Sequence, residues 1–259
     1  MKSEERKKRQ LKKWQKIIIA AFFWVAVWFV AAAAVGKELL IPSPVVVVSR
    51  LGKLIFEKEF WLKTLISLLR VLGGFAAGCV AGVILAVTAS VSGVAESIIS
   101  PFIRIIRSTP VTSFIMLVML WIGYTFVPVF IAALLVTPIV FSNLREGICE
   151  TDRQLLEVAQ IYNFGKVKTI KTVYIPSEKP YFISAAVTSL GLAWKAGIAA
   201  EVLCLPSDAI GREIYYSKLY LETPDLFAWT VVVIIFSILF EKIFEKIVKK
   251  GVKKDDENK

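Results

Sequence analysis

The sequence contains no histidine among its 259 residues, which removes the commonest general base and the commonest neutral metal ligand. Cysteine is scarce: only Cys79, Cys149 and Cys204 are present, an odd number without metal-type spacing. No stretch matches the G-x-x-x-x-G-K-S/T pattern, so the chain has no recognisable nucleotide site of its own. We therefore expect no cofactor, no metal site and no catalytic residues, and we interpret the cysteines as packing residues.

Apolar residues and positive charge are abundant instead. The chain is 56% hydrophobic, with a mean hydropathy of +0.66, and several windows approach the ~20 apolar residues that cross about 30 Å of hydrocarbon. A net charge of +11 would indicate nucleic-acid binding in a soluble protein. Here Lys and Arg collect in short segments between the apolar blocks, as the positive-inside rule describes. The sequence therefore predicts an all-α integral membrane protein that contacts lipid and binds no nucleic acid.

The apolar blocks predict six spans within one transmembrane domain, residues 17–248. The first run has 19 residues, longer than a signal-peptide core of about 7–15, so we interpret it as an uncleaved span. Residues 109–143 carry no charge and lie between basic segments that both favour the cytoplasm, so two short crossings with a tight external turn are expected. The predicted spans are 17–35, 70–91, 109–123, 126–143, 180–203 and 226–243.

The distribution of basic residues predicts the orientation of these spans. Segments assigned to the cytoplasm carry 23 Lys and Arg, and segments assigned to the exterior carry six. This asymmetry places the basic N-terminal segment 1–16 and the charged tail 249–259 both in the cytoplasm. The chain is thus expected to be a multi-pass protein of a cell membrane.

The segments around the second span carry further signals. Pro42 and Pro44 are expected to break any helix in the external loop 37–61. Residues 92–108, with Arg104 and Arg107, are interpreted as a short cytoplasmic linker. Small residues recur every four positions in the second span and predict a face on which another helix packs closely: Gly74, Gly78, Gly82, Ala86 and Ser90. Upstream, Lys63, Thr64, Ser67 and Arg70 form a polar face expected at the membrane interface.

A polar, basic stretch interrupts the apolar sequence between the fourth and fifth spans. Thr151 and Gln154 form a T-x-x-Q capping box that begins a helix, and Asn163 suits the left-handed turn that ends it. A second amphipathic segment follows, and Pro176 is expected to stop it. Periodicity predicts a helix–turn–helix on the cytoplasmic surface, which we call the 150–176 hairpin. Periodicity also allows a simple connector or an anchor on anionic lipid headgroups.

The 150–176 hairpin resembles the EAA loop of bacterial ABC importer permeases, which runs E-A-A, three residues, Gly, nine residues and an I-x-L-P-like ending. Glu157 and Ala159 match two of the leading residues, Val158 replaces the middle Ala, and Asn163 stands where the family has Gly, followed by Gly165. Ile175 and Pro176 match the ending. Other segments are similar to permeases of the nitrate/sulfonate/taurine type: 42–44, 106–110, 191–197 and 200–201.

This resemblance implies a function and a set of partners. Two copies of such a permease form a pore as a homodimer, and each EAA loop docks on one of two cytoplasmic ATP-binding subunits. An extracytoplasmic substrate-binding protein delivers the solute, so the permease is not itself an enzyme. The resemblance places the chain in the bacterial inner membrane and leaves sulfonates, taurine, nitrate, bicarbonate and pyrimidine vitamin precursors open as substrates.

Three residues of the fifth span are candidates for the translocation path. Lys195 lies at a depth where a charge is costly, so it could contact an anion, snorkel or pair with an acid. Glu201 lies near the outer end, where a gate or docking role competes with solvation at the interface. Trp194 lines the pore or packs.

The main alternative function is an ion-gradient-driven secondary transporter. Such proteins need acids within their spans or inverted repeats with broken helices. We find no Asp or Glu deep in any predicted span and no internal repeat. A membrane enzyme has little support, because no paired-carboxylate site or nucleophile motif lies in the spans.

Overall fold

Helices form every regular element of the described chain. The computed structural model describes the backbone of residues 2–256, and side chains for 15–16, 18–240 and 242–243. The ends of the predicted cytoplasmic segments 1–16 and 249–259 therefore lie outside the described residues. The chain divides into two compact units, Met1–Trp61 with Glu213–Val231, and Leu62–Arg212 with Val232–Lys259.

The first unit contains the N-terminal helix α1 (Lys2–Val35) and the short helix α2 (Pro44–Ile55). We expected Pro44 to break a helix in the 37–61 loop, and this was wrong. Pro44 occupies the first turn of α2, where no backbone N–H is needed and a fixed φ favours the helix. The indole Nε1 of Trp28 in α1 donates to the carbonyl oxygen of Pro42 at 3.1 Å and so fixes the chain ahead of α2.

Charge and aromatic contacts tie α2 and the residues just after it to the start of α11 (Thr223–Asp256) within the first unit. The Arg50 guanidinium donates to both carboxylate oxygens of Asp225, and this hydrogen bond raises the pKa of Arg50. Phe60 stacks on Trp229 with ring centroids 5.0 Å apart. The predicted external loop 204–225 also contains a helix, α10 (Ile210–Leu219).

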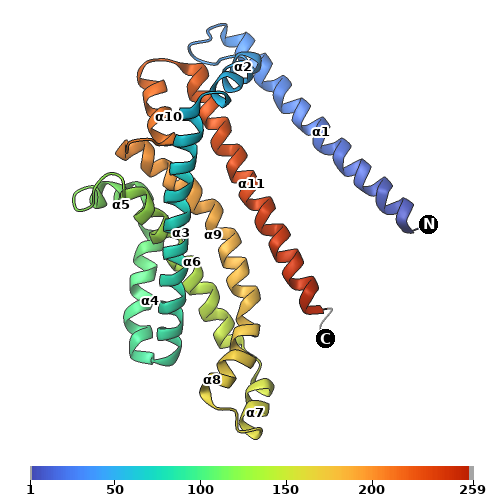
Figure 1. Cartoon of the computed structure of the whole chain (residues 1–259), viewed down its shortest axis with the longest axis vertical. Coiled ribbons are helices and arrows are strands. Elements are labelled where there is room, and N and C mark those ends of the chain that lie inside the picture. The colour runs from blue at the N-terminus through green and yellow to red at the C-terminus, as the bar shows by residue number, and fades with distance from the viewer. Residues whose placement is uncertain (1, 257–259) are drawn as a thin grey trace. The chain divides into compact units, whose positions relative to one another are not determined.

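The second unit is a helical bundle whose members include α3 (Lys58–Val91), α6 (Val127–Glu150) and α9 (Ile175–Cys204) (Figure 1). The small residues predicted to form a packing face do so against α6. A Cβ added to Gly78 would lie 2.7 Å from the Cβ of Val136, and one added to Gly82 would lie 2.7 Å from the Cβ of Val140. The two backbones thus approach closely only because these positions lack side chains.

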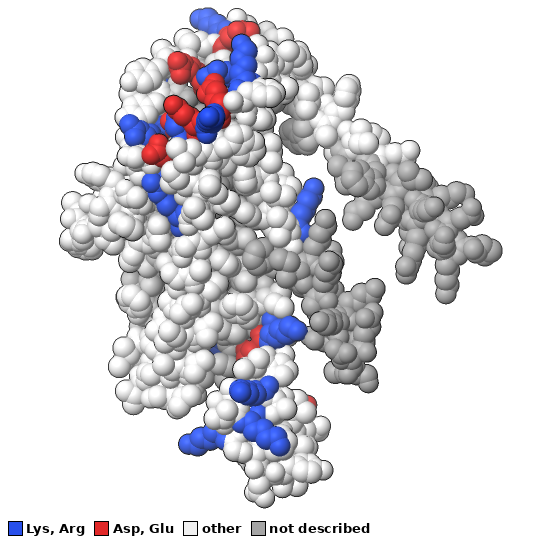
Figure 2. Space-filling model, in the orientation of Figure 1, with Lys and Arg blue, Asp and Glu red and all other residues white. Residues whose placement is uncertain are grey.

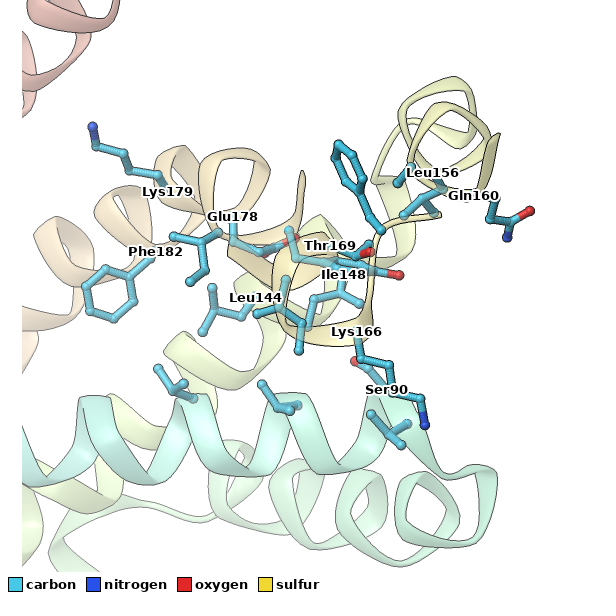
Figure 3. A pocket seen from close by; sticks show the side chains of 18 residues that line it. Ser90, Leu144, Ile148, Leu156, Gln160, Lys166, Thr169, Glu178, Lys179 and Phe182 are labelled. Atoms are coloured by element: carbon cyan, nitrogen blue, oxygen red, sulfur yellow. The ribbon is translucent and has the colours of Figure 1, made fainter. Parts of the chain in front are cut away.

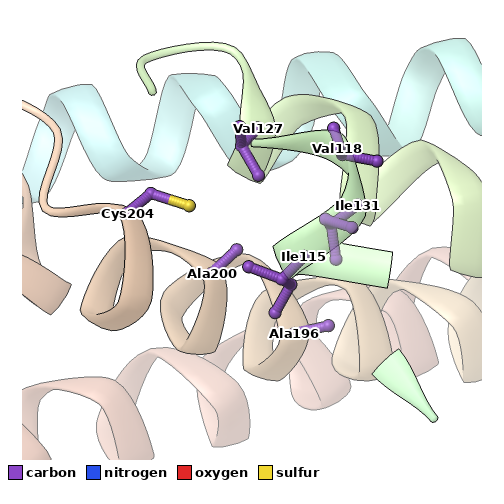
Figure 4. Close-up of a cluster of buried hydrophobic side chains, with 7 residues drawn as sticks. All are labelled: Ile115, Val118, Val127, Ile131, Ala196, Ala200 and Cys204. Atoms are coloured by element: carbon purple, nitrogen blue, oxygen red, sulfur yellow. The ribbon is translucent and has the colours of Figure 1, made fainter. Parts of the chain in front are cut away.

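A buried apolar cluster joins the short helix α5 (Val111–Val118) to α6 and α9 (Figure 4). Ile115 and Ile131 are completely buried there, and Cys204 is one of the members, as expected for a packing cysteine. The cluster consists of Ile115, Val118, Val127, Ile131, Ala196, Ala200 and Cys204.

The predicted linker 92–108 is instead a helix, α4 (Gly93–Ser108), followed by α5 after a bend of 103°. Pro110 explains the bend, because a residue before proline avoids the helical region, and Thr109 is extended with ψ of 134°. Glu96 of α4 forms an ion pair with Arg145 of α6, and the Arg107 guanidinium donates to Ser142 Oγ at 3.2 Å. Arg104 and Arg107 therefore lie on a helix packed beside α6.

Five described helices are long and apolar enough to cross a membrane, and the bent α4–α5 pair brings the number to six if it counts as one span. Four of the predicted spans fall within long helices that extend past the predicted bounds. Apolar runs set the minimum length of a span, but polar residues continue the helix before the run in α3 and on both sides of it in α11.

Packing of α3 on α6 gives the first prediction. Gly78→Val should lower stability by about 1–3 kcal/mol or more, because the added side chain overlaps α6. Gly73→Val is the matched control, since a Cβ at Gly73 meets nothing within 4 Å. The measurement is the thermal unfolding midpoint of each purified variant in detergent. Equal midpoints for the two variants would contradict the close packing.

Candidate functional site

The 150–176 hairpin begins with α7 (Arg153–Ile161), whose cap differs from the one predicted. Asp152, not Thr151, is the N-cap, and its carboxylate accepts from the Gln154 backbone N–H at 2.9 Å. The Thr151 hydroxyl is buried and donates to the Gly147 carbonyl of α6 at 3.2 Å. Asp is as good an N-cap as Thr, so the helix starts one residue later than predicted. Thr151 is then not needed as a cap, and its hydroxyl bonds to α6 instead.

Asn163 ends α7 in the left-handed region, with φ of 49°. The Phe164 N–H bonds to the Ala159 carbonyl at 2.8 Å, and the Asn163 N–H bonds to the Gln160 carbonyl at 2.9 Å. These two bonds form a Schellman motif, which satisfies carbonyls that the helix end would leave free. The chain then passes Gly165, the extended N-cap residue of α8 (Lys166–Thr169).

The second arm of the hairpin does not end at Pro176, contrary to expectation. A π-helical turn, η1 (Ile170–Tyr174), joins α8 directly to α9, and Ile175 is helical with φ of −58°. Pro176 lacks an N–H and its ring would clash with the carbonyl four residues earlier in a regular helix. A wider π turn just before proline relieves this conflict. The hairpin is therefore continuous with the predicted fifth span.

One side of α7 faces the rest of the second unit, and the other side exposes apolar residues. Ala159 is 3% exposed, whereas Ile161 is 76% and Tyr162 is 71% exposed. Leu155 and Val158 are also exposed, and so is Glu157. Large apolar side chains clustered on a surface helix indicate a face that another molecule covers.

The junction between α6 and α9 contains a feature that the sequence did not reveal. Both carboxylate oxygens of Glu178 are buried, and neither has a hydrogen-bond partner among the described residues. A Cβ at Gly147 would collide with Glu178 Oε2 and lie 2.7 Å from the Tyr181 ring. The Tyr181 hydroxyl donates to Glu150 at 2.6 Å. The absence of a side chain at Gly147 therefore allows Glu178 and Tyr181 to pack against α6.

Trp194, a candidate for the path, is completely buried inside the second unit. Its indole Nε1 donates to the Val233 carbonyl at 3.0 Å, and its ring packs on Phe236 and Phe240. Trp194 is thus a packing residue that joins α9 to α11 in this structure, which is one of the two roles expected for it.

Glu201 is also completely buried, so neither solvation at the interface nor exposure to a path describes it here. Its carboxylate accepts from Ser67 Oγ at 2.8 Å, from the Gly211 N–H at 3.1 Å and from the Arg70 guanidinium at 3.5 Å. Arg70 also donates to the carbonyls of Ser207 and Asp208. We call Ser67, Arg70, Glu201, Ser207, Asp208 and Gly211 the outer network.

Ser67 and Arg70 were predicted to form a polar face at the membrane interface, and the structure places them in the outer network instead. Ser67 is completely buried, and its Oγ accepts from the Ile210 N–H at 2.9 Å while it donates to Glu201. The outer network therefore binds the connection between α9 and α10 to α3. Sequence spacing found the polar residues of α3 but not their partner, because Glu201 lies 131 residues beyond Arg70.

Lys195 is exposed, unlike the other two candidates, Trp194 and Glu201. Lys195 also has no carboxylate within ion-pair distance in the part of the chain that the structure describes. Of the three predicted path residues, only Lys195 is therefore accessible.

Comparisons with known proteins agree on one class. Residues 78–253 match the family of binding-protein-dependent transport system inner membrane components. The aliphatic sulfonates transport permease SsuC of Escherichia coli is 30% identical over 83% of this chain and 81% of its own length. SsuC of Bacillus subtilis is 27% identical over 87% and 81%, and the nitrate import permease NrtB of Synechococcus elongatus is 26% identical over 76% and 74%.

Solved structures share the fold at low sequence identity. An amino acid ABC transporter chain gives a TM-score of 0.61 at 17% identity, over 72% of this chain and 91% of that one. A chain of the methionine transporter MetNI in an inward-facing conformation gives 0.56 at 18% identity, over 73% and 93%.

The chain belongs to the family of binding-protein-dependent transport system inner membrane components. It is a permease subunit of an ABC importer and a multi-pass inner-membrane protein, not an enzyme, and ATP is hydrolysed by a separate subunit. This assignment replaces the alternative of an ion-gradient-driven transporter.

Burial of Glu201 gives the second prediction. Glu201→Ala should lower the free energy of unfolding by about 3–5 kcal/mol, because Arg70 and two other donors lose a buried acceptor. Glu222→Ala removes an exposed acid and should change stability by no more than about 0.5 kcal/mol. Thermal unfolding of the purified variants tests this. A Glu201→Ala variant as stable as Glu222→Ala would rule out a structural role for the outer network.

Proposed function

We propose that the 150–176 hairpin faces the cytoplasm and docks on the ATP-binding subunit of the importer. The observation that carries this proposal is the exposed apolar face of α7, formed by Leu155, Val158, Ile161 and Tyr162. These residues lie beside the exposed Glu157, in a segment rich in lysine, between two apolar blocks. A rigid helix with such a face suits a groove on another protein.

The residues that resemble the EAA loop divide into two roles in this proposal. Glu157 is exposed and available to the partner, whereas Ala159 is buried and holds α7 against the second unit. Asn163 and Gly165 shape the turn, and Ile175 and Pro176 begin α9. Since the hairpin continues into α9, movement of the ATP-binding subunit would reach a span directly. ATP can shift the transporter only through unequal affinity for its inward-open and outward-open states.

The proposal also specifies how the chain crosses the membrane and how the subunits of the importer assemble. The bent α4–α5 pair counts as one span, which gives six spans and places both termini in the cytoplasm. The excess of Lys and Arg in the segments assigned to the cytoplasm supports this orientation. Two identical copies of the chain form the pore, each bound to one ATP-binding subunit, and an extracytoplasmic binding protein supplies the substrate.

A small anionic solute is the proposed substrate. Relatives of the chain are named for aliphatic sulfonates, nitrate and bicarbonate, which are all anions. Exposed Lys195 offers an ammonium without a carboxylate partner in the described residues, and such a group would attract an oxyanion. We therefore place Lys195 on the translocation path.

Docking is tested at Ile161, because 76% of its side chain is exposed and its replacement leaves α7 folded. Ile161→Asp should reduce co-purification of the ATP-binding subunit by about tenfold or more, since it puts a charge at the centre of an apolar contact. Gln160→Asp adds the same charge to exposed α7 surface about 100° around the helix from Ile161 and should bind normally. Normal binding of Ile161→Asp would contradict docking at this face.

The anion contact is tested at Lys195. Lys195→Met should raise the KM for uptake of an anionic substrate about ten- to a hundredfold, because a hydrogen bond to a charged group is lost. Lys195→Arg keeps the charge and should stay much closer to the unchanged protein. Radiolabelled uptake into proteoliposomes that contain the whole importer measures both. An unchanged KM in Lys195→Met would remove this residue from the path.

A further inference from the structure

An apolar cavity of about 810 Å³ lies between the 150–176 hairpin and the ends of α3 and α6 (Figure 3). Val83, Val87 and Val91 of α3 form one wall, and Leu144 and Ile148 of α6 form another. The hairpin closes the cavity with Ala159, Phe164, Ile170 and neighbouring residues. Its volume falls in the range of about 300–1,000 Å³ that is typical of ligand sites.

The cavity lies at the end of an apolar stretch. Residues 71–91 of α3 carry no charge, and the last nine of them include the cavity wall. With the hairpin on the cytoplasmic side, as proposed above, the cavity is at the boundary between hydrocarbon and headgroups. Apolar side chains at that depth are in reach of acyl chains.

Three lysines lie on the arm of the hairpin that borders the cavity, and one of them lines it. Lys166 lines it and also lines a second, shallow hollow together with Lys168 and Lys171. The Lys168 ammonium lies 3.9 Å from the ring centroid of Phe164, which is itself a wall of the cavity. None of the three lysines has a carboxylate within ion-pair distance in the described residues. Figure 2 shows basic side chains gathered over this end of the second unit.

Glu178 is the single acid among the residues that line the cavity. Both carboxylate oxygens of Glu178 are buried, and Oε2 lies against Gly147 of α6. Lys179, also a lining residue, points its ammonium away from the cavity (Figure 3). The cavity is therefore apolar inside and cationic at one side.

We propose that this cavity binds one anionic phospholipid, with an acyl chain between α3 and the hairpin and the phosphate on Lys166, Lys168 and Lys171. Basic pockets between helices at the cytoplasmic surface are suited to anionic headgroups. The face proposed to dock the ATP-binding subunit is a different one, because Ile161 and Tyr162 are exposed and do not line the cavity. A bound lipid would hold the hairpin to α3 and so couple membrane composition to the movement of α9.

The test is photocross-linking from inside the cavity of the whole importer, in nanodiscs of equimolar phosphatidylcholine and phosphatidylglycerol. p-Benzoylphenylalanine replaces Val87, which lines the cavity, or Val80, which is exposed on α3 but does not line it. The mass of the adduct identifies what occupies the cavity. We expect phosphatidylglycerol to predominate at position 87 and no headgroup preference at position 80.

The headgroup contact is tested with a triple variant, Lys166→Gln, Lys168→Gln and Lys171→Gln. It should lower the phosphatidylglycerol adduct at position 87 by about tenfold or more, because it removes three charges that attract the anionic headgroup. Its control replaces three exposed lysines of the first unit, Lys37→Gln, Lys53→Gln and Lys58→Gln, and should leave the adduct unchanged.

Two results would overturn the proposal. One is an adduct with a peptide of the ATP-binding subunit at position 87, which would make the cavity part of the protein interface. The other is equal labelling by both lipids, or labelling that the triple variant leaves unchanged. Neither readout depends on uptake, so failure here is distinguishable from failure of the docking or substrate proposals.

Discussion

Close contact between α3 and α6 is the constraint on which the rest of the second unit depends. At Gly74, Gly78 and Gly82 any added Cβ would overlap α6, so the helices approach at backbone distance. In a bilayer there is no hydrophobic force between helices, and such close packing has to supply the attraction. With α6 fixed on α3, its other sides accept α4 through the Glu96–Arg145 ion pair and α9 through the buried apolar cluster.

The inner end of this bundle combines stiffness with an exposed surface. A Schellman turn at Asn163 fixes the angle between the two arms of the hairpin, and the π turn before Pro176 removes the break that proline would cause. Burial of Ala159 and Thr151 ties α7 to the bundle, while its outward apolar residues stay free for a partner. In the proposed function, the hairpin would receive force at its exposed face and pass it to α9.

Sequence patterns predicted what depends on local chemistry. The helical class, the packing face of α3 and the turn residue Asn163 follow from apolar runs, four-residue spacing and backbone preference. The patterns failed where residues distant in the sequence determine the secondary structure or the burial of a side chain. The linker 92–108 became a helix because α6 supplies Arg145 and Ser142 as partners, and Glu201 became buried because Ser67 and Arg70 satisfy it. Pro176 was misread because a π turn, which leaves no simple sequence signal, accommodates it.

The outer network has a mechanical meaning when α9 is considered from end to end. Glu201 binds the outer end of α9 and the following connection to α3 through Ser67 and Arg70, with no solvent reaching the carboxylate. The other end of α9 is continuous with the hairpin through the π turn. A rod clamped at one end and pushed at the other swings about the clamp, and its largest excursion occurs at the free end. The side chains of α9 nearest the hairpin would thus sweep the widest arc, and those beside Glu201 would hardly shift.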